Sequence, residues 1–179
     1  MSARERKTIL AYWLIPAEPA WSYFRSLIKD LATRFDAPEF EPHLTTYVTQ
    51  AGNDDPTTVL EEAFANFQSL RLSSTGIDYS DEFTKTLFVQ FRADETLTRL
   101  SGKLRSASVA PCEYQLNPHL SLIYQKMPPE MKMQIANSLC LPFSEVEFDS
   151  VKAIVSPAKI ETSDDVNSWR AVATQRLTK

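Results

Sequence analysis

The feature that most constrains this chain is a short phrase that occurs twice. PHLTTYV spans residues 42–48 and PHLSLIY spans residues 118–124, and together they contain the only two histidines of the sequence, His43 and His119. The histidines lie 76 residues apart, and strands expected near residues 9 and 70 recur near 85 and 146 at the same offset. The pattern predicts an internally duplicated α+β chain, in which a pseudo-twofold axis brings equivalent residues to one cleft.

Apolar periodicity and proline placement set the expected elements of each half. Apolar runs and alternating patterns indicate strands, whereas apolar residues spaced three and four apart indicate helices. Asp55 before Pro56, and Asp94 further along, are typical helix N-caps. The expected strands span 9–15, 43–49, 70–77, 85–91, 119–124, 146–157 and 168–177, and the expected helices span 20–35, 56–68, 94–107 and 128–140.

Length and composition fit one folded unit. The 179 residues suit a single domain, 1–179, with lobe-like halves at about 8–78 and 84–178. A net charge of −4 argues against a surface that grips long nucleic acid, whereas a small phosphate ligand needs only local donors. Because both histidine phrases lie in one chain, we expect a monomer that holds the whole site.

The N-terminal segment resembles a signal peptide, because basic residues precede an apolar run. That run, Ile9–Ile15, is short and Pro16 ends it, so we expect a buried strand instead. No run approaches the roughly 18 apolar residues that a membrane span needs, and we expect a cytoplasmic protein that does not contact a membrane. Cys112 and Cys140 lack metal-ligand spacing and are expected to be unpaired thiols.

Strand geometry places a hydroxyl beside each histidine. Residues i and i+2 of a strand share a face, so His43 lies beside Thr45 and His119 beside Ser121. An imidazole exchanges protons near neutral pH, and a hydroxyl can donate to a phosphate oxygen. Two imidazoles flanking a phosphodiester could take one proton from water and give another to the leaving alkoxide. One such motif is more often structural, but two in equivalent places favour a catalytic function.

The same geometry makes a prediction about two tyrosines. Strict alternation puts Tyr47 on the face of His43, and puts Tyr124 opposite His119 unless the strand ends or twists there. A metal site that uses both histidines is an alternative, but zinc usually takes three or more protein ligands. No carboxylate or thiol lies in register with these pairs, so we expect neither a metal nor another cofactor.

These motifs together resemble the two-histidine (2H) phosphoesterase superfamily, and within it the plant-type cyclic phosphodiesterases. Besides the histidine phrases, YWLIP, STGIDYSDEFTKTLFV and SWRAVATQRL resemble segments of that group, so the likeness covers nearly the whole chain. The resemblance implies a bilobal fold, in which two antiparallel sheets surround a central cleft with pseudo-twofold symmetry and the helices lie outside.

The resemblance also implies an activity. That group opens ADP-ribose 1″,2″-cyclic phosphate, a by-product of tRNA splicing, and nucleoside 2′,3′-cyclic phosphates to phosphomonoesters. Carried over by position, His119 activates water and His43 protonates the leaving oxygen. Substrate contacts are then expected from Thr45, Ser121, Trp13, Tyr124, Tyr47 and Lys85. Lys85 stands where the plant group has an uncharged residue, and it either contacts the phosphate or lies in solvent.

Two other functions stay open. An RNA-end enzyme of the same superfamily, of the RNA 2′,3′-cyclic phosphodiesterase or 2′–5′ RNA ligase type, needs a basic track for the strand. Gln125 and Lys126 follow the second motif where many such enzymes carry arginine, and this favours a small substrate. A binding module without turnover would not need both histidines and both hydroxyls. Outside the site, we expect Trp21 and Trp169 in the core and a solvated turn at 163–165.

Overall fold

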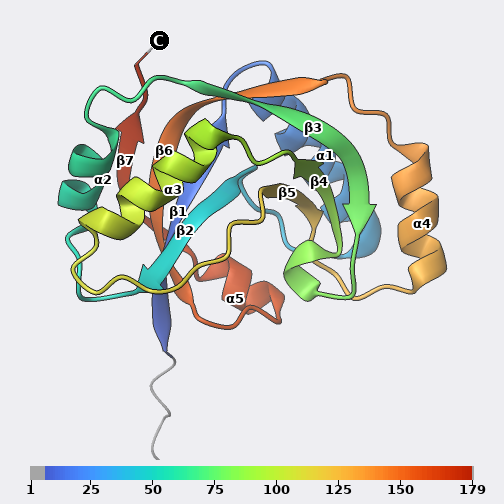
Figure 1. Ribbon diagram of the computed structural model, residues 1–179. Helices are drawn as coiled ribbons and strands as arrows, with labels where there is room; N and C mark the ends of the chain where they lie inside the picture. Colours follow the sequence, from blue (N-terminus) through green and yellow to red (C-terminus); the bar gives the residue numbers. More distant parts are fainter. Residues whose placement is uncertain (1–6, 179) are drawn as a thin grey trace, which may run out of the picture.

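The computed structural model describes residues 7–178, so the residues before Lys7, including the basic start of the signal-like segment, lie outside it. The elements follow the expected alternation of strands and helices (Figure 1). In chain order they are β1 (Thr8–Pro16), α1 (Ala20–Phe35), β2 (Leu44–Gln50), α2 (Pro56–Phe64), β3 (Leu70–Tyr79), the 3₁₀ turn η1 (Phe83–Lys85), β4 (Leu87–Phe91), α3 (Glu95–Ala107), β5 (His119–Ile123), α4 (Pro129–Ser138), β6 (Glu145–Pro157), α5 (Ser163–Asn167) and β7 (Arg170–Arg176).

The strands form one antiparallel sheet in the order β1-β2-β5-β4-β3-β6-β7, with a further pairing of β1 to β6. The six strands β1 to β6 therefore form a closed ring of pairings, and β7 pairs with β6 outside that ring. The contact between β2 and β5 is a single register pair, Leu44 opposite Leu120. This pair joins two strand groups, β2–β1–β6–β7 and β5–β4–β3, and the antiparallel α+β class is confirmed.

The two sequence halves are interleaved within that sheet. β3, the third strand of the first half, pairs with β4 of the second half, and β6, the third strand of the second half, pairs with β1 of the first. The long β6 also reaches β3 through its first residues, with Phe148 opposite Leu70. The units at about 8–78 and 84–178 therefore exchange a strand, and each of the two strand groups contains strands from both units.

The helices lie outside the curved sheet (Figure 1). α2 packs on β7 and on α3, α3 packs on β2, α1 lies along β5, and α4 lies along β3. β1 is buried on both faces, as its apolar run predicts: Leu10, Tyr12 and Leu14 enter the main core, whereas Trp13 enters a second cluster on the other face. The second face is the one that carries the site described below.

The expected helix caps are present. The Asp55 carboxylate accepts from Thr57 N at 3.3 Å, and the Asp94 carboxylate accepts from Leu97 N at 2.7 Å. α2 ends at Phe64 and not near 68, because the chain turns through Asn66 at a positive φ of 62° before β3. No helix within residues 7–178 has both the length and the apolar character to cross a membrane.

Two local predictions were wrong. The strand expected from Lys85 begins at Leu87, because residues 83–85 form η1. The segment expected as a solvated turn is the short helix α5, in which Thr162 and Asp165 form a reciprocal capping box. Both cysteines are free thiols, as expected; Cys112 is half-buried and Cys140 is exposed.

Candidate active site

Each histidine strand carries a β-bulge at the equivalent position. In β2, Thr45 lies opposite Trp13 but Tyr47 lies opposite Tyr12, so Thr46 is an extra residue. In β5, Ser121 lies opposite Phe88 but Ile123 lies opposite Leu87, so Leu122 is the extra residue. The two extra residues are themselves 76 positions apart. The duplication therefore preserves a backbone irregularity as well as the histidine and hydroxyl that precede it.

The bulges reverse the faces of the residues that follow, because a bulge breaks strict alternation. Tyr47 belongs to the main core, where its hydroxyl donates to Cys112 O at 3.3 Å and accepts from Cys112 N at 2.9 Å. Its expected place on the face of His43 was wrong, and Val48 lines the pocket instead. Tyr124 does reach the pocket, because β5 has passed its bulge and ended at Ile123.

Most of the predicted site residues meet around one pocket of about 220 Å³. They come from β1, from β2 and the residue before it, and from β5 and the residue after it, segments that are far apart in the sequence. The predicted residues on the lining are Trp13, His43, Thr45, His119, Ser121 and Tyr124; the others are Ile9, Ala11, Val48, Thr84, Tyr114, Ser156, Ile160 and Trp169. Tyr47 and Lys85 are the two predicted residues that do not line it.

Both imidazoles are anchored in the same way. His43 Nδ1 lies 2.6 Å from Glu41 O, and His119 Nδ1 lies 2.7 Å from Asn117 O. A carbonyl oxygen only accepts, so in each ring the proton sits on Nδ1. Neutral His43 and His119 therefore both keep the Nε2 lone pair for a ligand, and each can act as a base or, once protonated there, as an acid.

His43 is enclosed by aromatic rings. Trp13 stacks on it with 3.6 Å between centroids and 12° between planes, and Trp169 and Phe40 meet it edge-on at 5.7 and 6.0 Å. Burial lowers the pKa of His43 to about 4, because the apolar surroundings disfavour the charged ring. His43 is therefore neutral at pH 7.

His119 is less enclosed. One ring contacts it, Phe88, edge-on at 5.5 Å. Burial is the largest cause that lowers the pKa of His119; the Lys85 charge lowers it further, while the bond to Asn117 and the Glu82 charge oppose these effects. Lys85 Nζ itself lies 4.7 Å from the centroid of the Phe88 ring.

The two hydroxyls differ in what they already bind. Ser121 Oγ donates to Thr84 O at 2.7 Å. The Thr45 side chain has no hydrogen-bond partner among the described residues, whereas its backbone carbonyl accepts from Tyr114 Oη at 3.3 Å. Thr45 therefore has a donor ready for a ligand oxygen, whereas Ser121 has to exchange a partner.

A second layer holds the carbonyls that anchor the histidines. Lys152 Nζ donates to both carboxylate oxygens of Glu41 at 2.7 Å, and Lys152 lies opposite Trp13 in the sheet. On the other side, Gln90 Nε2 donates to Pro118 O at 2.7 Å and to Asn117 Oδ1 at 3.2 Å. One anchoring loop is thus held by an ion pair and the other by a neutral amide.

Trp169 is one of the lining residues that sequence reasoning missed, since it was expected in the core. It meets Trp13, His43 and Tyr124 edge-on, at 5.0, 5.7 and 5.8 Å. It lies between α5 and β7, where no local pattern marks the pocket. Its segment lies within the SWRAVATQRL phrase that resembles the plant group, and that phrase was the available signal.

The donor set of the pocket is neutral apart from the imidazoles. No lysine or arginine is among the lining residues, and residues 7–178 contain no group of three or more His, Cys, Asp and Glu arranged to hold a metal ion. Any positive charge that the lining itself presents to a phosphate must therefore come from protonated His43 or His119.

Comparison with known proteins agrees with this geometry. The sequence matches the family of cyclic phosphodiesterase-like proteins over residues 9–177. A cyclic phosphodiesterase from Arabidopsis thaliana is 21% identical over 175 residues, covering 96% of this chain and 97% of that protein.

Solved structures share the fold at low identity. A crystal structure of a phosphoesterase has a TM-score of 0.58 at 13% identity and covers 96% of this chain and 99% of its own. E. coli LigT complexed with 3′-AMP has a TM-score of 0.57 at 11% identity, with 97% and 99% covered. Since the family match spans nearly the whole chain, the protein belongs to the cyclic phosphodiesterase-like family of 2H phosphoesterases and is an enzyme of the phosphodiesterase class.

Proposed function

We propose that this protein hydrolyses a small, nucleotide-derived cyclic phosphate to a phosphomonoester, without a metal ion. The substrates are ADP-ribose 1″,2″-cyclic phosphate and nucleoside 2′,3′-cyclic phosphates. The observation that carries the proposal is the matched pair His43 and His119, each anchored through Nδ1 to a carbonyl and each beside a hydroxyl on one pocket.

In the proposed reaction, one imidazole accepts a proton through Nε2 from a water whose oxygen forms the new bond to phosphorus. The ring P–O bond breaks, and the other imidazole gives its Nε2 proton to the leaving alkoxide. Thr45 and Ser121 donate to the non-bridging oxygens. Following the family resemblance, His119 is the base and His43 the acid. The indole face of Trp13 supports a charged His43 ring, because an imidazolium on an aromatic face gains cation–π attraction.

Substrate binding has to raise the pKa of the histidine that acts as the acid. Burial lowers the pKa of both histidines, so the anionic phosphate must raise the pKa of the one that donates. This supports a substrate whose charge enters the pocket itself. The absence of lysine and arginine from the lining supports a small ligand over a long RNA strand, which needs a basic track.

Phosphorus NMR of the purified protein tests the proposal directly. Three substrates are compared with EDTA present: ADP-ribose 1″,2″-cyclic phosphate, a nucleoside 2′,3′-cyclic phosphate, and an RNA oligomer that ends in a 2′,3′-cyclic phosphate. Conversion of the small substrates to one monoester, at a rate well above that of the oligomer, is the expected result. Preference for the oligomer would assign the RNA-end function, loss of turnover with EDTA would restore the metal alternative, and binding without conversion would leave a binding module.

A further inference from the structure

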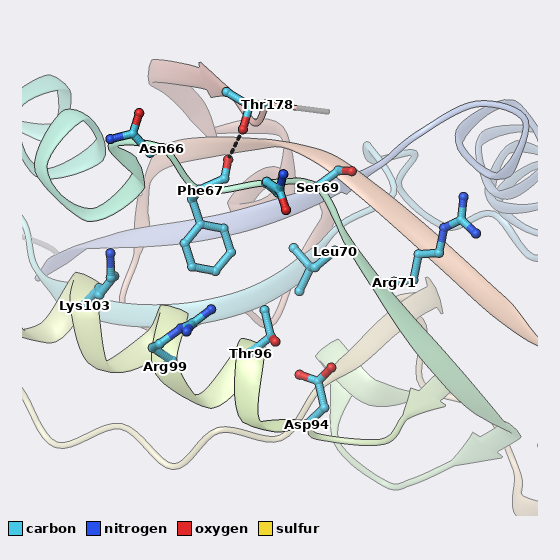
Figure 2. A pocket seen from close by; sticks show the side chains of 11 residues that line it. Asn66, Phe67, Ser69, Leu70, Arg71, Asp94, Thr96, Arg99, Lys103 and Thr178 are labelled. Carbon is cyan, nitrogen blue, oxygen red and sulfur yellow. Dashed lines mark hydrogen bonds between the residues drawn. The ribbon is translucent and has the colours of Figure 1, made fainter.

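A second cavity among the described residues is larger than the histidine pocket. It has a volume of about 750 Å³ and lies between one face of α3 and the chain that joins α2 to β3 (Figure 2). Its α3 wall carries Thr96, Arg99 and Lys103, which fall on one stripe of the helix. A neighbouring cavity of about 500 Å³ shares Arg99 and Lys103, so these two side chains border both cavities, which together we call the groove.

Arg99 and Lys103 have no carboxylate partner among the described residues. Glu95 stands one turn before Arg99 on the same helix, the ordinary place for an ion pair, yet no ion pair joins them. Glu62 lines the neighbouring cavity and does not pair with Lys103 either. Two like charges four residues apart also destabilise a helix slightly.

Both cations are instead turned to one buried ring. The Arg99 guanidinium carbon and Lys103 Nζ each lie 5.8 Å from the centroid of Phe67, which is 7% exposed (Figure 2). Phe67 is fixed by its own backbone: its carbonyl accepts from Thr178 N at 3.0 Å and from Thr178 Oγ1 at 3.1 Å. Cations held in place by a rigid ring lose less conformational freedom when they bind an anion.

We propose that this groove is a second ligand site, which binds a phosphate-bearing ligand between Arg99 and Lys103. Asp94 is the acidic residue on the lining of the larger cavity; its carboxylate caps α3 and forms no ion pair with Arg99 or Lys103. At the other end of the cavity, Arg71 already pairs with Glu147 at 3.1 Å and adds little free charge. The recognised chemistry is therefore one or two phosphoryl groups, supplied by inorganic pyrophosphate or by a nucleotide.

This site is separate from the histidine pocket. Phe67 and Leu70 belong to the main core cluster, whereas Trp13 belongs to the cluster on the other face of β1. No residue lines both cavities. Ligand binding at the groove therefore does not depend on the proposed hydrolysis, and either proposal can fail without the other.

Residue-resolved NMR titration tests the second site on the wild-type protein. Amide signals are followed while inorganic pyrophosphate or adenosine 2′-monophosphate is added at fixed, near-physiological salt. We expect saturable shifts at residues 66–71 and 96–103, apart from any shifts near His43 and His119. Equal affinity for both ligands would show that phosphate is recognised alone, and tighter nucleotide binding would show that the groove also reads the nucleoside; both outcomes support the site.

Charge-matched variants supply the control. R99Q/K103Q is expected to weaken binding at the groove at least tenfold, whereas K29Q/R92Q, which removes two exposed cations elsewhere, leaves it unchanged. Melting temperatures of all three proteins check the fold. F67L keeps an apolar side chain but removes the aromatic face, and a several-fold loss is expected. Shifts confined to the histidine pocket, or equal losses in both double variants, would overturn the proposal.

Discussion

The half-sites of His43 and His119 have the same local backbone geometry but differ in the side chains that surround each histidine. Each has an Nδ1–carbonyl anchor two residues upstream, a hydroxyl two residues downstream, and a bulge one residue later. His43 lies under the face of Trp13, whereas His119 meets only the edge of Phe88, the residue equivalent to Trp13 in the opposing register.

The two half-sites show how a duplicated fold can hold two catalytic imidazoles in different surroundings. Duplication fixes where the two imidazoles stand, because strand register and bulges are backbone properties. The aromatic or charged neighbours then set how easily each ring is protonated. General acid–base catalysis on one phosphate needs one imidazole to hold a proton while the other lacks it. Burial makes His43 the harder of the two to protonate, so its proposed role as the acid requires the bound phosphate to raise its pKa.

Removing either imidazole is the change with the largest expected effect. His43→Ala and His119→Ala should each lower kcat by about 10²–10⁴-fold, the range for a general acid or base. Phosphorus NMR rates on a nucleoside 2′,3′-cyclic phosphate measure this, and circular dichroism checks the fold. The double variant should lose little more than either single one, because the pair acts as a unit. A near-normal rate in one single variant would break the paired assignment.

The burial of His43 should appear in stability as a function of pH. Its pKa is about 4 in the folded protein against 6.5 ordinarily, so the unfolded chain binds the proton more readily. The stabilisation is present above pH 6.5 and is lost as the pH falls towards 4, and it amounts to about 3 kcal/mol.

Denaturant unfolding of wild type and His43→Gln at pH 7 and pH 4 measures this difference. Wild type should lose about 3 kcal/mol more than the variant, since glutamine does not titrate. His119→Gln, which replaces the more exposed ring, should show a smaller difference. Equal behaviour of the two variants would remove the proposed inequality between the half-sites.

Removing either hydroxyl is expected to have a smaller effect than removing an imidazole, and the two hydroxyls should differ from each other. Thr45→Val keeps the side-chain shape but removes an unengaged donor, so we expect kcat/KM to fall about tenfold with little change in stability. Ser121→Ala should lower both activity and stability, because Thr84 O also loses its donor. Kinetics and thermal melts on both variants separate the two patterns; a stability loss in Thr45→Val alone would reverse the assignment.

The smallest expected effects come from the second layer. Lys152→Met and Gln90→Met each replace a polar side chain with an apolar one of similar shape, and each removes the contacts that hold one anchoring loop. Lys152→Met should lower kcat several-fold, up to about tenfold, at nearly constant KM, because a displaced imidazole is poorly oriented. Gln90→Met should do less, since neutral hydrogen bonds are weaker.

The positioning role of Lys152 has a distinct signature. Lys152→Arg should recover most of the rate, because arginine can still pair with Glu41. A purely structural role would lower the melting temperature of Lys152→Met without changing kcat. An effect on KM alone would point to substrate binding in place of positioning.

Much of the site could be predicted from local sequence pattern. The predictions for Tyr47 and Trp169 failed because distant parts of the chain place both residues. His43, Thr45, His119, Ser121, Trp13 and Tyr124 meet at the pocket as the repeated phrases and the family resemblance indicated. Tyr47 does not line the pocket, because Thr46 is an extra residue in the pairing of β2 with β1 and this bulge turns Tyr47 to the other face. Trp169 was missed because it lies 156 residues after Trp13 in the sequence, and only the fold brings the two rings together.

The sequence by itself determined the duplicated order of elements, the caps at Asp55 and Asp94, and the histidine–hydroxyl pairs, because each depends on neighbours within a few residues. The tertiary structure decided the exchange of β3 and β6 between the halves, the two bulges, and the aromatic enclosure of His43. Strand register and burial are set by the partner across the sheet, and no local stretch of sequence contains its partner.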